Sequence, residues 1–180
     1  MPTVNLKWFP AHQDLRPFVF GQVRLRGHLF DRPLRFLVDT GSKQTLISPR
    51  HELLLARDDR SAYSRIKFSP AATPIKGITG TAPTKYVRSD GYAAPTGIEL
   101  ATTSGQGQFV GINHLLFVDR SEPIMPRRLR FMGKLLWVRV DRYRMVACEG
   151  DDYSIIGWDV LGTCTMHIQG GNPPSGHLEF

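Results

Sequence analysis

An aspartate stands at the end of a short apolar run, in a pattern that could place a carboxylate in an active site. Residues 36–38 are Phe-Leu-Val, and they lead directly into Asp39. Gly41 lets the backbone turn closely there because it has no Cβ. Thr40 and Ser42 supply hydroxyls that can hold the carboxylate and the loop. A buried aspartate is costly unless it is hydrogen-bonded or functional, so Asp39 is the candidate catalytic group.

The residues around the Asp-Thr-Gly motif are more informative than the motif itself. Asp-Thr-Gly alone occurs by chance in on the order of a few per cent of chains of this length, and a strand-capping turn is the structural alternative. Here the motif follows an apolar strand and precedes Thr45-Leu-Ile47, which would pack beneath it. The serines, histidines and cysteines form no nucleophile elbow and no Cys/His arrangement. We therefore expect no metal and no cofactor.

The elements around the motif are expected to be mostly strands, because apolar and polar residues alternate with period two. Residues 18–27 and 34–38 are predicted to pair as a hairpin through a turn at 31–33. Ser48 and Pro49 are typical of a helix start, which predicts a helix over 51–56. Hairpin character is expected over 76–87. Further strands are expected at 98–102, 109–118, 135–140, 143–147, 154–156, 165–168 and 177–180.

Composition indicates a single globular domain over residues 1–180, with 41% hydrophobic and 22% charged residues. The net charge of +7 would attract nucleic acid, anionic membranes or acidic peptides. Basic residues are densest at Arg127-Arg128-Leu129-Arg130, with Arg139, Arg142 and Arg144 nearby. This cluster contains no zinc-finger, RNP or helix-turn-helix pattern, so a solvated basic face is favoured over nucleic-acid binding.

Compartment is indicated by the cysteines and by the start of the chain. Cys148 and Cys164 match neither a zinc spacing nor a disulfide framework, which favours reduced thiols in a cytoplasmic protein. The first residues lack the basic and apolar regions of a secretory signal. No stretch approaches the roughly 20 apolar residues needed to span a bilayer, so no membrane association is expected.

Three segments together resemble the retropepsin-like aspartic proteases of retroviruses and bacteria. Phe36–Ser48 is similar to the family's apolar strand, Asp-Thr-Gly-Ala/Ser, two variable residues, Thr and an aliphatic pair. Ile75–Thr81 resembles the family's glycine-bearing flap hairpin. Ser154–Leu161, Ser-Ile-Ile-Gly-Trp-Asp-Val-Leu, resembles the Ile-Ile/Leu-Gly-x-Asp/Asn-aliphatic-Leu element near the C-terminus. The three segments stand in the family's order.

The resemblance implies a mainly β fold, a closed acid-protease β-barrel with one or two short helices. It covers about residues 18–180 and leaves an insertion at about 106–145, expected to hold a strand pair or loop. Two positions depart from the retroviral pattern. Trp158 stands where those enzymes usually have Arg, and Gln44 stands where they have an acidic residue. The intersubunit ion pairs of the viral dimer therefore do not carry over to this chain.

The resemblance also implies roles for residues around Asp39. Thr40 would cross-link two catalytic loops by hydrogen bonds, and Gly157 would permit close packing behind the catalytic loop. The substrate-binding flap would contain Gly77, Ile78, Thr79 and Gly80, and a plain hairpin turn is the alternative there. A C-terminal strand would enter an intersubunit sheet. The candidate segments for this strand are 165–168 and 177–180.

Peptide hydrolysis by this chemistry needs two carboxylates that share a proton around one water, and the chain has one such motif. Ser89-Asp-Gly91 is no second copy, because no apolar strand precedes it. A symmetric homodimer would bring Asp39 to its counterpart. The sequence thus predicts an aspartic endopeptidase that acts on polypeptides. The alternative is a catalytically silent, retropepsin-like dimeric module that binds peptide or nucleic acid.

Overall fold

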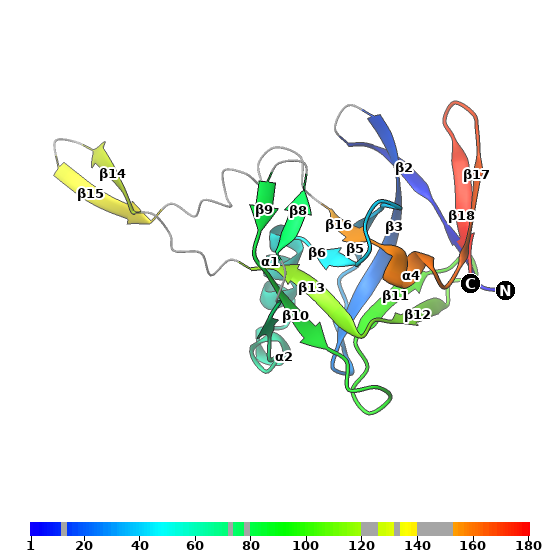
Figure 1. The fold of residues 1–180 in the computed structure, drawn as a ribbon, viewed down its shortest axis with the longest axis horizontal. Coiled ribbons are helices and arrows are strands. Elements are labelled where there is room, and N and C mark those ends of the chain that lie inside the picture. The colour runs from blue at the N-terminus through cyan, green and yellow to red at the C-terminus, as the bar shows by residue number, and fades with distance from the viewer. Residues whose placement is uncertain (12–13, 72–73, 78–79, 120–125, 132–133, 140–152) are drawn as a thin grey trace.

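Strands dominate the structure, a computed structural model that describes residues 1–11, 14–71, 74–77, 80–119, 126–131, 134–139 and 153–180. Strands hold 46% of the chain and helices 14%, so the predicted mainly β class is confirmed. Figure 1 shows one large twisted sheet, two helices packed on one side, and a separate sheet at the two chain ends.

The large sheet is built around a long hairpin. Strand β3 (Asp14–Leu25) pairs antiparallel with β5 (Leu34–Val38), as the alternating pattern predicts. The hydrogen-bonded order is β12-β11-β3-β5-β16-β6-β13-β10-β7, and β2 and β4 also pair with β3. Closure of this path into a barrel stays a prediction. The remaining members are β2 (Lys7–Ala11), β4 (His28–Leu29), β6 (Leu46–Ile47), β7 (Ser69–Pro70), β10 (Thr84–Arg88), β11 (Gly97–Ala101), β12 (Gly107–Gly111), β13 (His114–Val118) and β16 (Ser154–Ile156).

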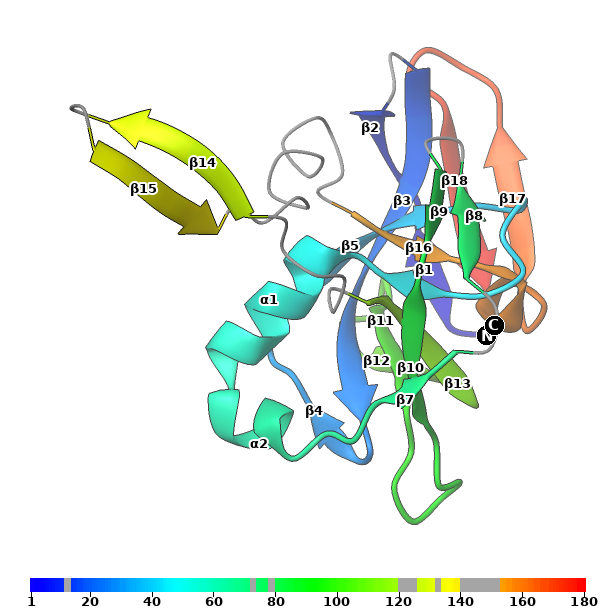
Figure 2. The ribbon, with the colours of Figure 1, turned by 60° about the vertical axis from the view of Figure 1, so that its left-hand side comes forward.

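A strand from late in the chain lies between two early ones. β16 (Ser154–Ile156) pairs parallel with β5 and antiparallel with β6 (Leu46–Ile47). β6 and β5 flank the Asp39 loop in sequence, so β16 inserts beneath that loop. Figure 2 shows β16 running beside β5 through the middle of the molecule.

The core fills the space behind this loop. Phe36, Ile47 and Ile156, one residue from each of the three strands, have no exposed side-chain surface. Leu34, Phe36 and Val38 of β5 are buried while the residues between them are half-buried, which is the period-two pattern. Burying these apolar faces fixes the position at which β5 ends and Asp39 begins.

Two helices follow β6. Helix α1 (Pro49–Asp58) begins as predicted, because the Ser48 hydroxyl accepts a hydrogen bond from the His51 N–H and Pro49 occupies the first turn. Helix α2 (Arg60–Ser64) follows directly, and the Asp59 carboxylate caps it by accepting from the Ala62 N–H. The expected fold has one or two short helices, but the sequence pattern predicts no residue range for α2.

A three-stranded sheet gathers the chain ends, in the order β1-β18-β17. β1 (Thr3–Asn5) pairs with β18 (Ser175–Glu179), which also pairs with β17 (Thr165–Gln169). Both predicted C-terminal strands are therefore present. β18 is paired on both sides within the chain, whereas β17 forms an outer edge of this sheet among the described residues.

Two hairpins form small sheets of their own. β8 (Ile75–Gly77) pairs with β9 (Gly80–Ala82), and β14 (Pro126–Phe131) pairs with β15 (Lys134–Arg139). The second hairpin lies within the expected insertion at 106–145, whereas β12 and β13 from the same interval belong to the large sheet. The expected strand at 143–147 lies outside the described residues.

The single strand predicted over 109–118 is wrong. The structure divides it into β12 and β13, because the chain turns at Ile112 and Asn113 between them. β12 pairs with β11, whereas β13 pairs with β10 and β6. In the part of the chain that the structure describes, no helix is both long and apolar enough to cross a bilayer.

Candidate active site

Asp39 sits immediately after β5, in a tight loop held by its own backbone. Its N–H donates to the Ile156 carbonyl at 3.1 Å, which joins the loop to β16. Its Oδ1 accepts from the Gly41 N–H at 2.9 Å, and its carbonyl accepts from the Ser42 N–H at 3.1 Å. The residue is half-buried. The carboxylate is thus fixed in position at a strand end while part of it still faces solvent.

Gly41 leaves room for this carboxylate. A Cβ built at Gly41 would lie 3.1 Å from Asp39 Oδ1, closer than nearly all real Cβ contacts. The two hydroxyl residues of the motif hold the loop rather than the carboxylate. The Ser42 hydroxyl donates to the Gln44 carbonyl at 2.7 Å, and the exposed Thr40 contributes its carbonyl to Trp158.

Asp159 joins the two halves of the site, a role that sequence reasoning did not assign. Its Oδ1 accepts from the Thr45 hydroxyl at 2.6 Å and its Oδ2 accepts from the Thr45 N–H at 2.9 Å. Thr45 is fully buried, and its Oγ1 also accepts from the Gly157 N–H at 3.2 Å. The sequence contains both residues in recognisable places, because Thr45 belongs to the Phe36–Ser48 motif and Asp159 belongs to the Ser154–Leu161 motif. Their contact becomes evident only when β16 inserts beside β6.

Gly157 lies where the two chain segments approach most closely. A Cβ there would lie 2.6 Å from both the carbonyl carbon and the carbonyl oxygen of Gln44, well below any real separation. These neighbours are backbone atoms, which cannot swing aside as a side chain can. A residue without a side chain is therefore required for the turn after β16 to rest against the Asp39 loop.

Trp158 begins helix α4 (Trp158–Leu161), a short helix that the sequence reading did not anticipate. Its backbone N–H donates to the Ser42 carbonyl at 3.0 Å, and its indole Nε1–H donates to the Thr40 carbonyl at 2.7 Å. The two hydrogen bonds hold the Asp39 loop at the residues immediately before and after Gly41. Trp158 nevertheless remains 53% exposed.

A buried polar network supports the site from below. The Ser154 hydroxyl accepts from the Ser48 N–H at 3.0 Å and lies 2.7 Å from His51 Nδ1. All three residues are buried. The network ties the start of α1 to β16, the strand that pairs with both β5 and β6 on either side of the Asp39 loop.

The residues expected to form a flap are only partly described. Gly77 and Gly80 face each other at the end of the β8–β9 hairpin. Ile78 and Thr79 lie outside the described residues. Figure 1 draws the hairpin near β6, which follows the Asp39 loop, and near β16, which pairs with β6.

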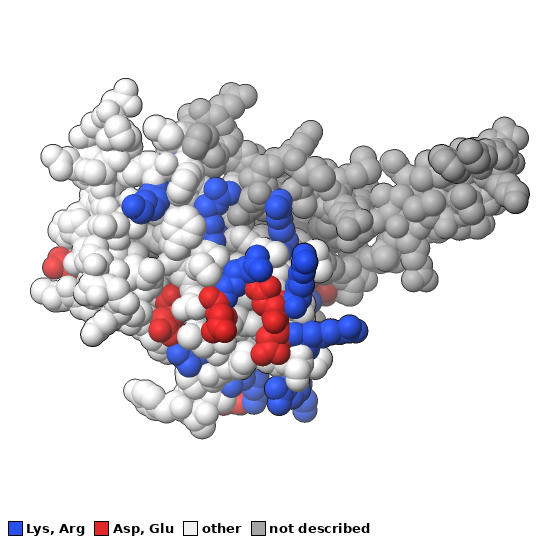
Figure 3. Space-filling model, turned by 180° about the vertical axis from the view of Figure 1, so that it is seen from behind, with Lys and Arg blue, Asp and Glu red and all other residues white. Residues whose placement is uncertain are grey.

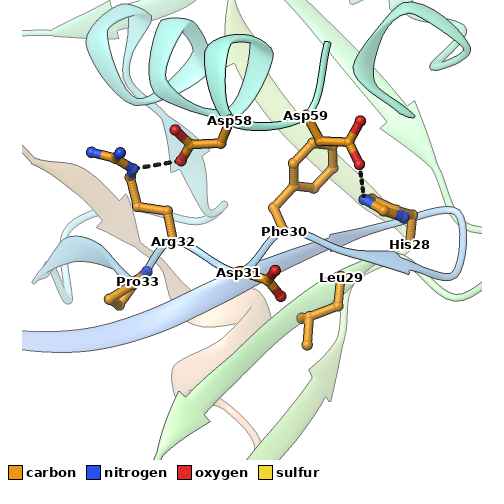
Figure 4. A pocket seen from close by; sticks show the side chains of 8 residues that line it. All are labelled: His28, Leu29, Phe30, Asp31, Arg32, Pro33, Asp58 and Asp59. Carbon is orange, nitrogen blue, oxygen red and sulfur yellow. Dashed lines mark hydrogen bonds and ion pairs between the residues drawn. The ribbon is translucent and has the colours of Figure 1, made fainter. Parts of the chain in front are cut away.

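A separate shallow cavity of about 500 Å³ lies between the β4–β5 connection and the end of α1. Two of its acids are paired, because Arg32 bonds Asp58 and His28 Nε2 lies 3.1 Å from Asp59 Oδ2 (Figure 4). These pairs link the connection to α1, and we assign the cavity no catalytic role.

Charged residues are interleaved on the rear face of the molecule. Figure 3 shows acidic and basic side chains side by side there, rather than a uniform basic surface. The Arg127–Arg130 cluster belongs to β14, whose side chains are not described. Within the described ranges, no group of three or more His, Cys, Asp or Glu residues is placed to hold a metal ion.

Comparison with known proteins gives similarities at the level of structure. No family model matches the chain, and no curated protein matches it in sequence. The EIAV protease complexed with the inhibitor HBY-793 aligns with a TM-score of 0.42 and 17% identity, over 86% of this chain and 93% of that one. A retropepsin-like aspartic protease from Rickettsia conorii aligns with a TM-score of 0.37 and 11% identity, over 98% of this chain and 92% of that one. These are similarities of overall fold, and what the site can do follows from its own geometry.

Proposed function

We propose that the protein is an aspartic endopeptidase in which two copies of Asp39, one from each subunit of a homodimer, activate a water for peptide hydrolysis. The observation that carries this proposal is the fixed, half-buried Asp39 carboxylate at the end of β5, held by the Gly41 N–H. One carboxylate would act as base on the water while the other would hydrogen-bond the substrate carbonyl. Two like charges so close cannot both ionise, so the pair would share a proton.

The second copy is required because each chain supplies one such carboxylate. The outer edge of β17 supports assembly. Its sequence, Thr165-Met-His-Ile-Gln169, lacks the charged residues and prolines that protect isolated edge strands, and Ile168 is 53% exposed. Because β18 is already paired on both sides, β17 is the strand that we propose for pairing with a partner.

The remaining site residues have proposed supporting roles. Thr40 would cross-link the two Asp39 loops across the dimer. Gly41 and Ser42 would shape the loop, and Gly157 would let the turn after β16 pack behind it. The polypeptide substrate would lie beneath a flap formed by Gly77, Ile78, Thr79 and Gly80, which would exclude water during the reaction.

The direct test compares Asp39→Asn with the parent chain on an unfolded protein substrate at mildly acidic pH. The amide preserves shape but cannot take part in the shared-proton chemistry, so cleavage should fall by at least about a thousandfold while the circular dichroism spectrum is retained. Asp31→Asn, an exposed aspartate away from the loop, is the matched control and should retain activity. Cleavage by a folded Asp39→Asn protein at the parent rate would exclude the assignment.

Loss of cleavage should also be reproduced by an inhibitor of the pepstatin type. If the parent chain is a folded dimer that cleaves no protein or peptide between pH 3 and pH 7, the silent binding module replaces the enzyme. That result leaves the fold and the assembly intact but removes the catalytic role of Asp39.

A further inference from the structure

Trp158 exposes a large apolar ring at a rigid position next to the Asp39 loop. Trp158 is 53% exposed as a residue although its side chain is the bulkiest of the site. Its Nε1–H already donates to the Thr40 carbonyl, so the indole has no further hydrogen-bond donor to offer, and a partner would gain from it through apolar contact. A second bond, from the Trp158 N–H to the Ser42 carbonyl, fixes the backbone that carries the ring.

The position of Trp158 is set by the same loop that would meet its counterpart in the dimer. Thr40 directly follows Asp39, and consecutive Cα atoms lie about 3.8 Å apart. If two Asp39 carboxylates share one proton, the two Thr40 residues and the side chains bonded to them must lie close to the partner subunit. Trp158 is bonded to Thr40, and its exposed ring would be among the first apolar surfaces to meet the second copy.

The surroundings of Trp158 favour a protein partner over a side-chain pocket for substrate. Two cavities among the described residues lie elsewhere, one between the β4–β5 connection and α1, the other around Leu25 and Ala62. Neither cavity is lined by Trp158. A tryptophan that is preorganised, has its polar atom satisfied and presents a flat apolar face is typical of an interface hot spot.

We propose that Trp158 is an intersubunit anchor, whose exposed ring packs against a second copy of this chain beside the joined Asp39 loops. The proposal rests on the two-chain active site proposed above and adds the residue that couples assembly to that site. Because the indole also bonds the Thr40 carbonyl, formation of the dimer and ordering of the catalytic loop become one event.

The test measures the dimer dissociation constant by sedimentation for the parent chain and three variants. Trp158→Ala removes the ring and the bond to Thr40, and it should raise the dissociation constant by about 30-fold, the effect of a typical hot spot. Trp158→Phe keeps an apolar ring without the Nε1–H, and it should weaken the dimer less. Leu53→Ala is the matched control, because Leu53 is 56% exposed on α1, and it should leave the constant unchanged.

Cleavage activity is also measured as a function of protein concentration, which separates a loss of dimer from a loss of catalysis. Trp158→Ala should recover cleavage as concentration restores the dimer, whereas Asp39→Asn should not. A Trp158→Ala chain that keeps the parent dissociation constant overturns the anchor, and a raised KM with an unchanged dissociation constant assigns Trp158 to substrate contact instead. A parent chain that cleaves peptide as a monomer at constant specific activity overturns the two-chain function itself, so the two failures are distinguishable. If Trp158→Ala does not fold, Trp158→Gln takes its place, because its amide N–H can still donate to the Thr40 carbonyl while the ring is absent, and a parent-like dissociation constant for that folded variant overturns the anchor.

Discussion

Replacing Asp159 should lower the stability of the whole fold and loosen the Asp39 loop at the same time. Asp159→Ala removes the acceptors of two hydrogen bonds from Thr45, at 2.6 Å and 2.9 Å, and leaves the N–H of a fully buried residue without its partner. A hydrogen bond to a charged group contributes about 1.5–3 kcal/mol, and Asp159 is itself half-buried. Taking the two bonds together with this partial exposure, we expect the free energy of unfolding to fall by about 3 kcal/mol.

Asp159→Asn separates shape from charge. Its single carbonyl oxygen can still accept from the Thr45 N–H, and its amide N–H can donate to the Thr45 hydroxyl if that hydroxyl rotates. Both bonds to the charged carboxylate are replaced by bonds between neutral groups, so the expected loss is about 1.5 kcal/mol, less than for Asp159→Ala. In urea, a loss of 3 kcal/mol shifts the unfolding midpoint by about 1.5 M if the denaturant dependence is about 2 kcal/mol/M.

The measurement is urea unfolding followed by circular dichroism, with Asp31→Ala as the exposed-carboxylate control expected to change the free energy by less than about 0.5 kcal/mol. Thr45→Val in the Asp159→Ala background completes a double-mutant cycle, with an expected coupling of at least about 1 kcal/mol. An Asp159→Ala chain within 0.5 kcal/mol of the parent would mean that the Thr45 contacts do not stabilise the loop.

Three further predictions concern proton chemistry and buried charge. The rate of cleavage should follow a bell-shaped pH profile with an acidic optimum, because one shared proton is required, and a rate that still rises above pH 7 argues against the dyad. Lys85→Met should lower the free energy of unfolding by about 3 kcal/mol, because it removes the ammonium that lies 2.6 Å from the buried Glu52 carboxylate and leaves that charge with the neutral Tyr63 hydroxyl as its donor. Asp90→Asn, which breaks the exposed pair with Arg26, should cost under about 1 kcal/mol, and equal costs would contradict the role of burial. Burial raises the pKa of the Cys164 thiol, which lowers its thiolate fraction at a given pH. Iodoacetamide should therefore alkylate Cys164 more slowly in the folded than in the urea-unfolded chain at pH 8, as followed by mass spectrometry, and equal rates would exclude this.

Sequence patterns predicted the elements that are set by local features, namely alternating buried and exposed side chains or a helix cap. Residues 34–38 were predicted as a strand with the bounds that β5 has, because alternate side chains face the core. Ser48 and Pro49 predicted the start of α1, because capping is a local interaction. The C-terminal strands were likewise predicted to within a few residues of β17 and β18.

The features that the sequence did not predict are too short to show a period or depend on contacts between distant parts of the chain. Helix α4 has four residues, too few for a helical period to become visible. The break between β12 and β13 depends on pairing with two different sets of strands, which no local pattern records. In the same way, Asp159 and Thr45 were visible as motif letters, but their contact joins residues 114 apart in sequence.

The insertion of β16 beneath the Asp39 loop affects the order in which the chain can fold during its synthesis. The hydrogen bonds that join the two halves of the site span 112 to 118 residues of the chain. Closing such long loops is slow and entropically costly compared with forming the β3–β5 hairpin or α1. A nascent chain still on the ribosome therefore carries Asp39 long before β16 exists to hold it. Under the proposed function, an incomplete chain that lacks β16 could not hold its Asp39 loop in place and so would not cleave neighbouring polypeptides.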